Sequence, residues 1–362
     1  MIYFLAVIGI FDASCGPRIK ILSCLVVFSY YVSTIYYAVT CFSVILIYHS
    51  QIGIWHFSFA VNSMVIWYTL FRKKKEISVI TNKLFLLRKR RHIQSAESMY
   101  LQMLAVISTL VFFILCHTEY LVTDTDSHDF YDIWLLHSRI TDERFWIICI
   151  ITTNMFNFLM MFFPVLVTFV LSSTWYKFAE VLEYINNVLQ TSTFTKLKWK
   201  NVQCFEDFIE ISNILREMNI ILNYPIFFLV IYSLVTIFIS LCNFILLKDF
   251  LDYTLLLDIA LTFASSIVVL LMYCICGSKI PEKLSEIRLT VRVKINRHVF
   301  GLTPPISQSA LLCLRRMEME NLIYITVCGT FRLTKSFIFL ANGTIFTYDL
   351  LIINVFPDTK TF

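Results

Sequence analysis

The fold is decided by GTIFTYDLLIINVF, the stretch from Gly343 to Phe356 that closes the last long apolar segment of the chain. The sequence predicts one helix from about Leu322 to Phe356, which exceeds the ~20 residues that cross a ~30 Å hydrocarbon core. Counting back from Phe356 places one membrane border near Arg332 and Lys335, where both cations can reach lipid headgroups. The segment before them is expected to continue below the bilayer as a helix packed on other helices.

One face of this helix is small and polar. Ser336, Gly343, Thr347 and Asn354 follow one another at steps of seven, four and seven, which keeps them on a single face of a helix. The positions between them are mostly bulky and apolar. A polar stripe on a lipid-compatible helix must face protein or water. Periodicity alone leaves two alternatives open, which are helix packing through small residues and the lining of a pore.

The composition indicates an all-α membrane protein. The 362 residues are 58% hydrophobic and 15% charged, whereas soluble domains carry about 25% charged residues. The eleven cysteines are spread through apolar segments, and Cys274 and Cys276 have no metal-ligand spacing, so neither a disulfide framework nor a metal site is expected. Seven transmembrane helices are predicted, at about 21–48, 52–71, 99–122, 145–172, 225–247 and 253–276, with the seventh ending at Phe356.

The distribution of Lys and Arg predicts the orientation. Of the 30 such residues, 24 fall in segments on one side of the predicted spans and four (Arg139, Arg144, Lys248 and Lys360) on the other. The positive-inside rule therefore predicts a cytoplasmic amino terminus and an extracellular carboxy terminus. The most basic stretch, 72–91, is interpreted as a cytoplasmic loop that lies on anionic lipid, and not as a nucleic-acid site.

Helical periodicity also extends beyond the predicted spans. It continues past Ser172 through Leu189, and a second amphipathic run covers 202–222. Neither run can bury its apolar face alone, so both are expected to pack with the last long helix as cytoplasmic extensions that form an anchor region. We expect two parts: residues 1–276 as a six-helix peripheral bundle with a ligand pocket and cytoplasmic extensions, and residues 277–362 as a cytoplasmic linker and anchor helix leading to a pore-lining seventh helix.

The end of the chain resembles a known signature. The run Cys328-Gly329-Thr330-Phe331-Arg332-Leu333, followed by Thr347-Tyr348, five mostly apolar residues and an amide, is similar to the carboxy-terminal pattern of insect gustatory receptors, which are related to insect odorant receptors. The matching positions are Gly329, Phe331, Leu333, Thr347 and Tyr348. Asn354 stands where the family has Gln and Val355 where it has Phe, and Asp349 interrupts the hydrophobic five.

The resemblance implies a gustatory chemoreceptor that is itself a ligand-gated, non-selective cation channel in the plasma membrane of a sensory neuron. It implies a homotetramer, or a heterotetramer with related receptors, in which one last helix per subunit surrounds the pore, and it implies neither an enzyme nor a cofactor. The pore and gate are expected at Thr347, Leu351, Asn354 and Val355. The acid that follows Thr-Tyr, Asp349, resembles sugar-responsive members of the family, and the tastant is expected to be a sugar or a bitter compound.

The ligand pocket is expected among the outer halves of the second to sixth spans, where apolar walls with a few polar groups suit a small organic molecule. Its expected lining is Trp55, His56, Phe59, Asn62, Phe113, His117, Tyr120, Trp146, Thr153, Asn154, Ser240, Asn243, Asp258 and Thr262. The alternative is a seven-helix receptor that signals through a G protein, which the orientation and the absence of Asp-Arg-Tyr and Asn-Pro-x-x-Tyr elements oppose. A carrier or multi-pass enzyme ranks third, since the His137 and Asp142 pair is only a loose acyltransferase-like match.

Overall fold

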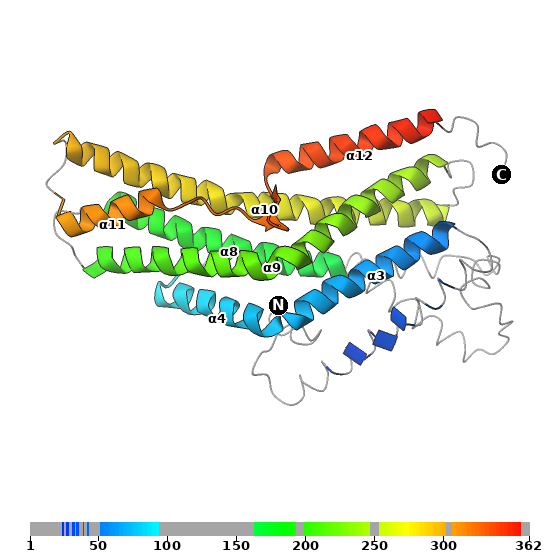
Figure 1. The fold of residues 1–362 in the computed structure, drawn as a ribbon, viewed down its shortest axis with the longest axis horizontal. Coiled ribbons are helices and arrows are strands. Elements are labelled where there is room, and N and C mark those ends of the chain that lie inside the picture. Colours follow the sequence, from blue (N-terminus) through cyan, green and yellow to red (C-terminus); the bar gives the residue numbers. More distant parts are fainter. Residues whose placement is uncertain are drawn as a thin grey trace.

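Two long helices, of 48 and 47 residues, run along most of the molecule in the computed structural model (Figure 1). The structure describes residues 51–93, 163–192, 199–246, 253–301 and 306–355, together with single helical positions between residues 24 and 42. The helices are α3 (Gln51–Arg72), α4 (Lys74–Arg90), α8 (Phe163–Thr191), α9 (Trp199–Leu246), α10 (Tyr253–Val299), α11 (Gln308–Met319) and α12 (Lys335–Val355), and two short strands, β1 (Thr326–Val327) and β2 (Phe331–Arg332), form a hairpin before α12.

The apolar segments are long enough to span a membrane. Within the described part of the chain, three helical stretches qualify by length and composition, Phe163–Thr191, Val202–Phe244 and Ile259–Val299. The amphipathic run 202–222 and the fifth span 225–247 were expected as separate elements, but they join in the single helix α9, which passes through a buried Pro225. The sixth span likewise continues without a break into the basic segment of α10, and Gly301 follows the end of that helix with a φ of +66°.

The parts of these helices beyond the predicted spans form a compact bundle with α4 and α11, which we call the basal bundle (Figure 1). Along α8, Trp175, Phe178, Leu182 and Ile185 follow at alternating steps of three and four and are completely buried. Their main partner is α10, which runs beside α8 and buries Ile280, Leu284, Ile287 and Val291. Each such side chain contributes about 1.5–3 kcal/mol by leaving water, so the continued periodicity past Ser172 is confirmed as a packed helix.

The basic stretch that contains α4 is folded onto protein. Ile80, Leu84 and Leu87 are buried, and α4 contacts α8 and α9. Four of its cations reach acids on those helices, in the pairs Lys83–Glu217, Arg88–Glu180, Arg90–Glu210 and Arg91–Asp207. The expectation that this stretch lies on lipid is therefore wrong for Arg88 and Arg91, which are largely buried against protein carboxylates, whereas Lys83 and Arg90 remain more exposed.

The expectation of one helix from Leu322 to Phe356 is also wrong. The chain is extended after α11, forms the β1–β2 hairpin, and becomes helical only at Lys335. The partners of the basal helices are therefore α10, α4 and α11, and not an extension of α12. The 21 residues of α12 give a length of about 31 Å, which matches one hydrocarbon core.

Candidate functional site

The helix α12 packs on its own chain with one narrow face. Phe337, Ile338, Ala341 and Ile345 are the residues of this face, and they pack against the core formed with α9 and α10. At 100° per residue, the polar stripe of Ser336, Gly343 and Thr347 lies on the opposite face. These three residues are exposed. Among the described helices, none packs on the stripe.

Bulky apolar side chains flank the stripe and are equally uncovered. Phe339 is 80% exposed and Leu351 is 53% exposed. The hydroxyl of Thr347 donates to the carbonyl of Gly343 at 2.7 Å, so its oxygen lone pairs stay available on the surface. Asp349, Asn354 and Val355 belong to α12, but their side chains lie outside the described residues. Within the described part of the chain, this face of α12 is thus left exposed.

The hairpin before α12 contains the first half of the family-like motif. Thr330 donates from its backbone to the carbonyl of Val327 at 3.1 Å, which closes a turn over Cys328 and Gly329. Both turn residues have positive φ, +50° and +69°, a conformation in which glycine has no Cβ penalty and which primed hairpin turns require. Of the other motif residues, Leu333 is fully buried and Phe331 is 59% exposed.

Two long helices hold the hairpin. On α9, the side-chain amide of Asn219 forms hydrogen bonds with the backbone of Tyr324 and Thr326. The side-chain oxygen of Asn223 accepts a hydrogen bond from the backbone N–H of Gly329 at 3.2 Å. On α10, Gly277 faces the hairpin, and a Cβ built on it would lie 3.6 Å from the Cβ of Leu333, which is an ordinary van der Waals contact. The hairpin therefore packs directly on α10 at this position.

The two cations expected at a membrane border lie at the base of α12. Lys335 begins the helix and pairs with Glu282 of α10 at 2.9 Å. Arg332 lies in β2 with its guanidinium 4.4 Å from the centre of the Tyr324 ring. Both side chains are exposed, and each also contacts a partner on the protein surface.

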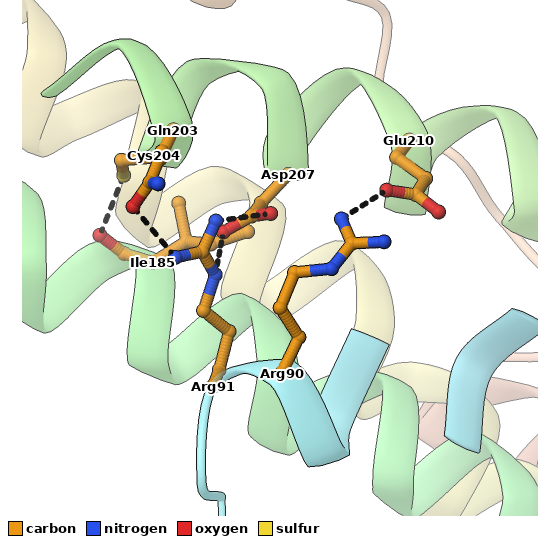
Figure 2. A network of polar contacts seen from close by, with 7 residues as sticks. All are labelled: Arg90, Arg91, Ile185, Gln203, Cys204, Asp207 and Glu210. Atoms are coloured by element: carbon orange, nitrogen blue, oxygen red, sulfur yellow. Dashed lines mark hydrogen bonds and ion pairs between the residues drawn. The ribbon is translucent and has the colours of Figure 1, made fainter. Parts of the chain in front are cut away.

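A second polar site joins α4 to the basal bundle (Figure 2). At the end of α4, Arg91 donates to the Asp207 carboxylate at 2.8 Å and to the Gln203 side-chain oxygen at 2.9 Å. The side chain of Asp207 is only 3% exposed. The hydrogen bond from Arg91 to Asp207 raises the pKa of the guanidinium against the effect of burial, so the charge that neutralises this acid is permanent. Figure 2 also shows the neighbouring Arg90 reaching Glu210 near the surface.

One turn earlier on α4, Arg88 pairs with Glu180 of α8 at 2.7 Å, with both side chains largely buried. Lys177 lies near this pair. Burial lowers the pKa of Lys177, the positive charge of Arg88 lowers it further, and Glu180 acts in the opposite direction. The corner between α4 and α8 thus places two cations beside one acid, and burial together with repulsion from Arg88 disfavours the charged form of Lys177.

The end of α8 is fixed by α10. Lys294 donates from its ammonium group to the backbone carbonyls of Gln190 and Ser192 at 3.4 and 2.8 Å. A cation at this position interacts favourably with the negative end of the helix dipole, and it donates hydrogen bonds to carbonyls that have no partner within the helix. Buried Asn186 accepts a hydrogen bond from Thr290 at 2.8 Å one turn earlier, so α8 and α10 are also held in register by polar contacts.

The expected ligand pocket is described only in part. Asn62 donates from its amide to the backbone carbonyl of Phe228 at 3.2 Å, which joins α3 to α9. Ser240 is buried on α9, whereas Asn243 of α9 and Thr262 of α10 are half-buried. Trp55, His56, Phe59 and Asp258 lie on α3 and α10 with side chains outside the described residues, and Phe113, His117, Tyr120, Trp146, Thr153 and Asn154 lie outside them entirely. The third span, the acidic loop and the His137 and Asp142 pair fall there as well.

Sequence reasoning missed the hairpin and the amides that hold it, although a signal was present. Ile323, Ile325 and Val327 alternate with more polar residues at a period of two, which is typical of a half-buried strand, and all three are buried. The glycine at 329 then marks the turn. The long apolar run that follows these residues favours a helix, which is why the sequence predicts a helix over the strand as well.

Comparisons with known proteins agree with this architecture. No family model matches the sequence, and no curated protein matches it. Two solved structures of the insect olfactory receptor OR5 from Machilis hrabei, one of them in complex with eugenol, are similar to the chain with TM-scores of 0.70 and 0.68. Each comparison covers 98% of this chain and 97% of the other at 13% sequence identity. The protein is therefore a helical membrane protein with the fold of an insect olfactory receptor.

Proposed function

We propose that this protein is a gustatory chemoreceptor that acts as a ligand-gated, non-selective cation channel. The observation that carries the proposal is the exposed face of α12, whose polar stripe points away from the helices α9 and α10 on which α12 packs. Four copies placed around an axis would cover that face and surround a path for ions. The shared fold with an insect olfactory receptor over almost the whole chain supports a receptor of the chemosensory kind.

In this proposal, the pore is lined by rings of Thr347, Leu351 and Asn354, with Val355 next to the mouth. An apolar ring at Leu351 stops ions by dewetting when the helices are close together, and hydroxyl and amide oxygens replace part of the hydration water when they separate. The subunits form a homotetramer or a heterotetramer with related receptors. The amino terminus is cytoplasmic and the carboxy terminus extracellular, in the plasma membrane of a sensory neuron.

The proposed ligand is a small organic tastant, either a sugar or a bitter compound, bound among the outer halves of the second to sixth spans. The olfactory receptor of similar fold has been solved with the small molecule eugenol, which supports a small-molecule site in this class of fold. Ligand binding opens the pore only to the extent that the ligand prefers the open over the closed arrangement.

The test is current recorded from cells that lack G-protein coupling, with sucrose, fructose, caffeine, quinine and eugenol as applied compounds. We expect at least one compound to evoke a cation current, and alanine at Trp55, His117, Trp146 or Asp258 to shift its dose-response curve. A response that appears only in cells with G-protein coupling would favour the alternative, a seven-helix receptor that signals through a G protein. Unchanged curves in all four variants would place the pocket elsewhere.

A cysteine scan tests the pore face independently. Cysteines at Leu351 and Asn354 are expected to react with a water-soluble methanethiosulfonate reagent in the open channel, whereas a cysteine at Ile352 is expected to be protected. Reaction at Ile352 with protection at the other two positions would show that another face of α12 lines the pore.

A further inference from the structure

The backbone of the hairpin is bound by side-chain amides of α9. Asn219 donates to the Tyr324 carbonyl at 3.2 Å and accepts from the Thr326 backbone N–H at 3.1 Å. It also lies 3.3 Å from the Thr326 hydroxyl. Backbone groups two residues apart point to the same edge of an extended strand. One carboxamide therefore takes the place that a neighbouring strand would fill.

The second amide secures the turn. Asn223 lies one helical turn after Asn219, and its side-chain oxygen accepts from the Gly329 backbone N–H at 3.2 Å. The other end of the hairpin is locked by a hydrogen bond from the Leu333 N–H to the Ile325 carbonyl at 2.9 Å and by the burial of Leu333. Since α12 begins two residues after Leu333, the position of its first turn is set by these contacts.

Helix α9 contains a proline directly after these two asparagines. Pro225 has no N–H to donate to the carbonyl of Ile221, so α9 lacks one helical hydrogen bond there. Figure 1 shows α9 bending between its basal and distal halves, with the hairpin beside the bend. Beyond this level α12 runs alongside the distal half of α9 and contacts it. The base of α12 is thus fixed before the proline, and its packing face follows the helix after it.

We propose that the hairpin is the pivot of α12, and that Asn219 and Asn223 are the positioning residues that hold this pivot on α9. When the distal half of α9 moves about Pro225, α12 turns about a base that stays with the basal bundle. The pivot converts a bend in the bundle into a displacement of the exposed α12 face. This inference rests on the proposed channel function for its consequence, but not for the contacts that define it.

The experiment uses the full chain with Leu351→Cys as a reporter on α12, and the probe is a positively charged methanethiosulfonate reagent. Asn219→Ala is expected to change the modification rate of the reporter about 5-fold or more, a coupling of the ordinary allosteric size, and to raise spontaneous current. Asn219→Asp keeps the acceptor for Thr326 but loses the donor to Tyr324, so an intermediate rate is expected. Asn213→Ala is the matched control, because Asn213 is an exposed asparagine of α9 that bonds only to Arg216 among the described residues.

Hydrogen exchange of residues 322–334 in the same variants reports whether the hairpin is loosened. A reporter rate that stays at the wild-type value in Asn219→Ala overturns the pivot, whether or not hairpin exchange increases. A reporter that reacts in no variant also counts against it. If Asn219→Ala does not reach the membrane, Thr326→Val, which removes a single contact of the amide, carries the same comparison. Currents absent from every variant refute the channel proposal, while the modification rates still decide the pivot.

Discussion

The ion pair between Arg91 and Asp207 offers a sharp test of the basal bundle. In Arg91→Ala the Asp207 carboxylate, 3% exposed, loses both its charge partner and a hydrogen bond. Removing one partner of a buried pair costs about 3–5 kcal/mol, because the remaining charge stays buried. Since 1 kcal/mol corresponds to about 2–4 °C for chains of 150–250 residues and to less for longer ones, we expect the melting temperature to fall by about 5 °C.

The neighbouring arginine is the matched control. Arg90 pairs with Glu210 at 3.5 Å, with side chains 58% and 39% exposed, and such surface pairs contribute about 0–1 kcal/mol. The assay is thermal unfolding of the detergent-purified protein at one fixed scan rate, because membrane proteins often unfold irreversibly. The double variant Arg91→Met with Asp207→Leu should recover most of the loss, since an apolar pair leaves no buried charge. Equal melting temperatures for Arg91→Ala and Arg90→Ala would refute the reasoning.

Four further outcomes are expected. Gly329→Ala should lower the melting temperature because its φ is +69°, whereas Gly343→Ala, which meets open space, should not. Leu351→Ser should raise ligand-independent current in whole-cell recordings, because a polar ring removes the dewetting barrier. Asn354→Asp should increase the permeability of divalent over monovalent cations, measured from reversal potentials. An epitope tag after Phe362 should stain intact cells, and staining only after permeabilisation would contradict the predicted orientation.

Composition and helical periodicity are enough to predict the class of protein and the character of its last helix. Hydrophobic content and segment length predict membrane helices, because a segment that lies in lipid must form its backbone hydrogen bonds internally. The steps between Ser336, Gly343 and Thr347 likewise placed a polar stripe on one face, since a helix has a fixed period. The structure confirms that this face is exposed among the described residues and that α8 continues past its predicted span.

The pairing of residues across the chain depends on how distant helices pack, and no local pattern predicts it. Arg91 and Arg90 are adjacent and chemically identical, yet one is buried on Asp207 and the other stays near the surface, because the packing of α4 on α9 turns only one of them inward. Local pattern predicts a helix from Leu322 to Leu333, since the apolar residues of this stretch adjoin a long apolar run. It is extended because Asn219, more than a hundred residues earlier, supplies the backbone hydrogen bonds that an isolated strand lacks. Local periodicity indicates which side chains avoid water. It does not indicate which residue will form hydrogen bonds with an exposed strand edge or pair with a charge, because that depends on which distant helices pack together.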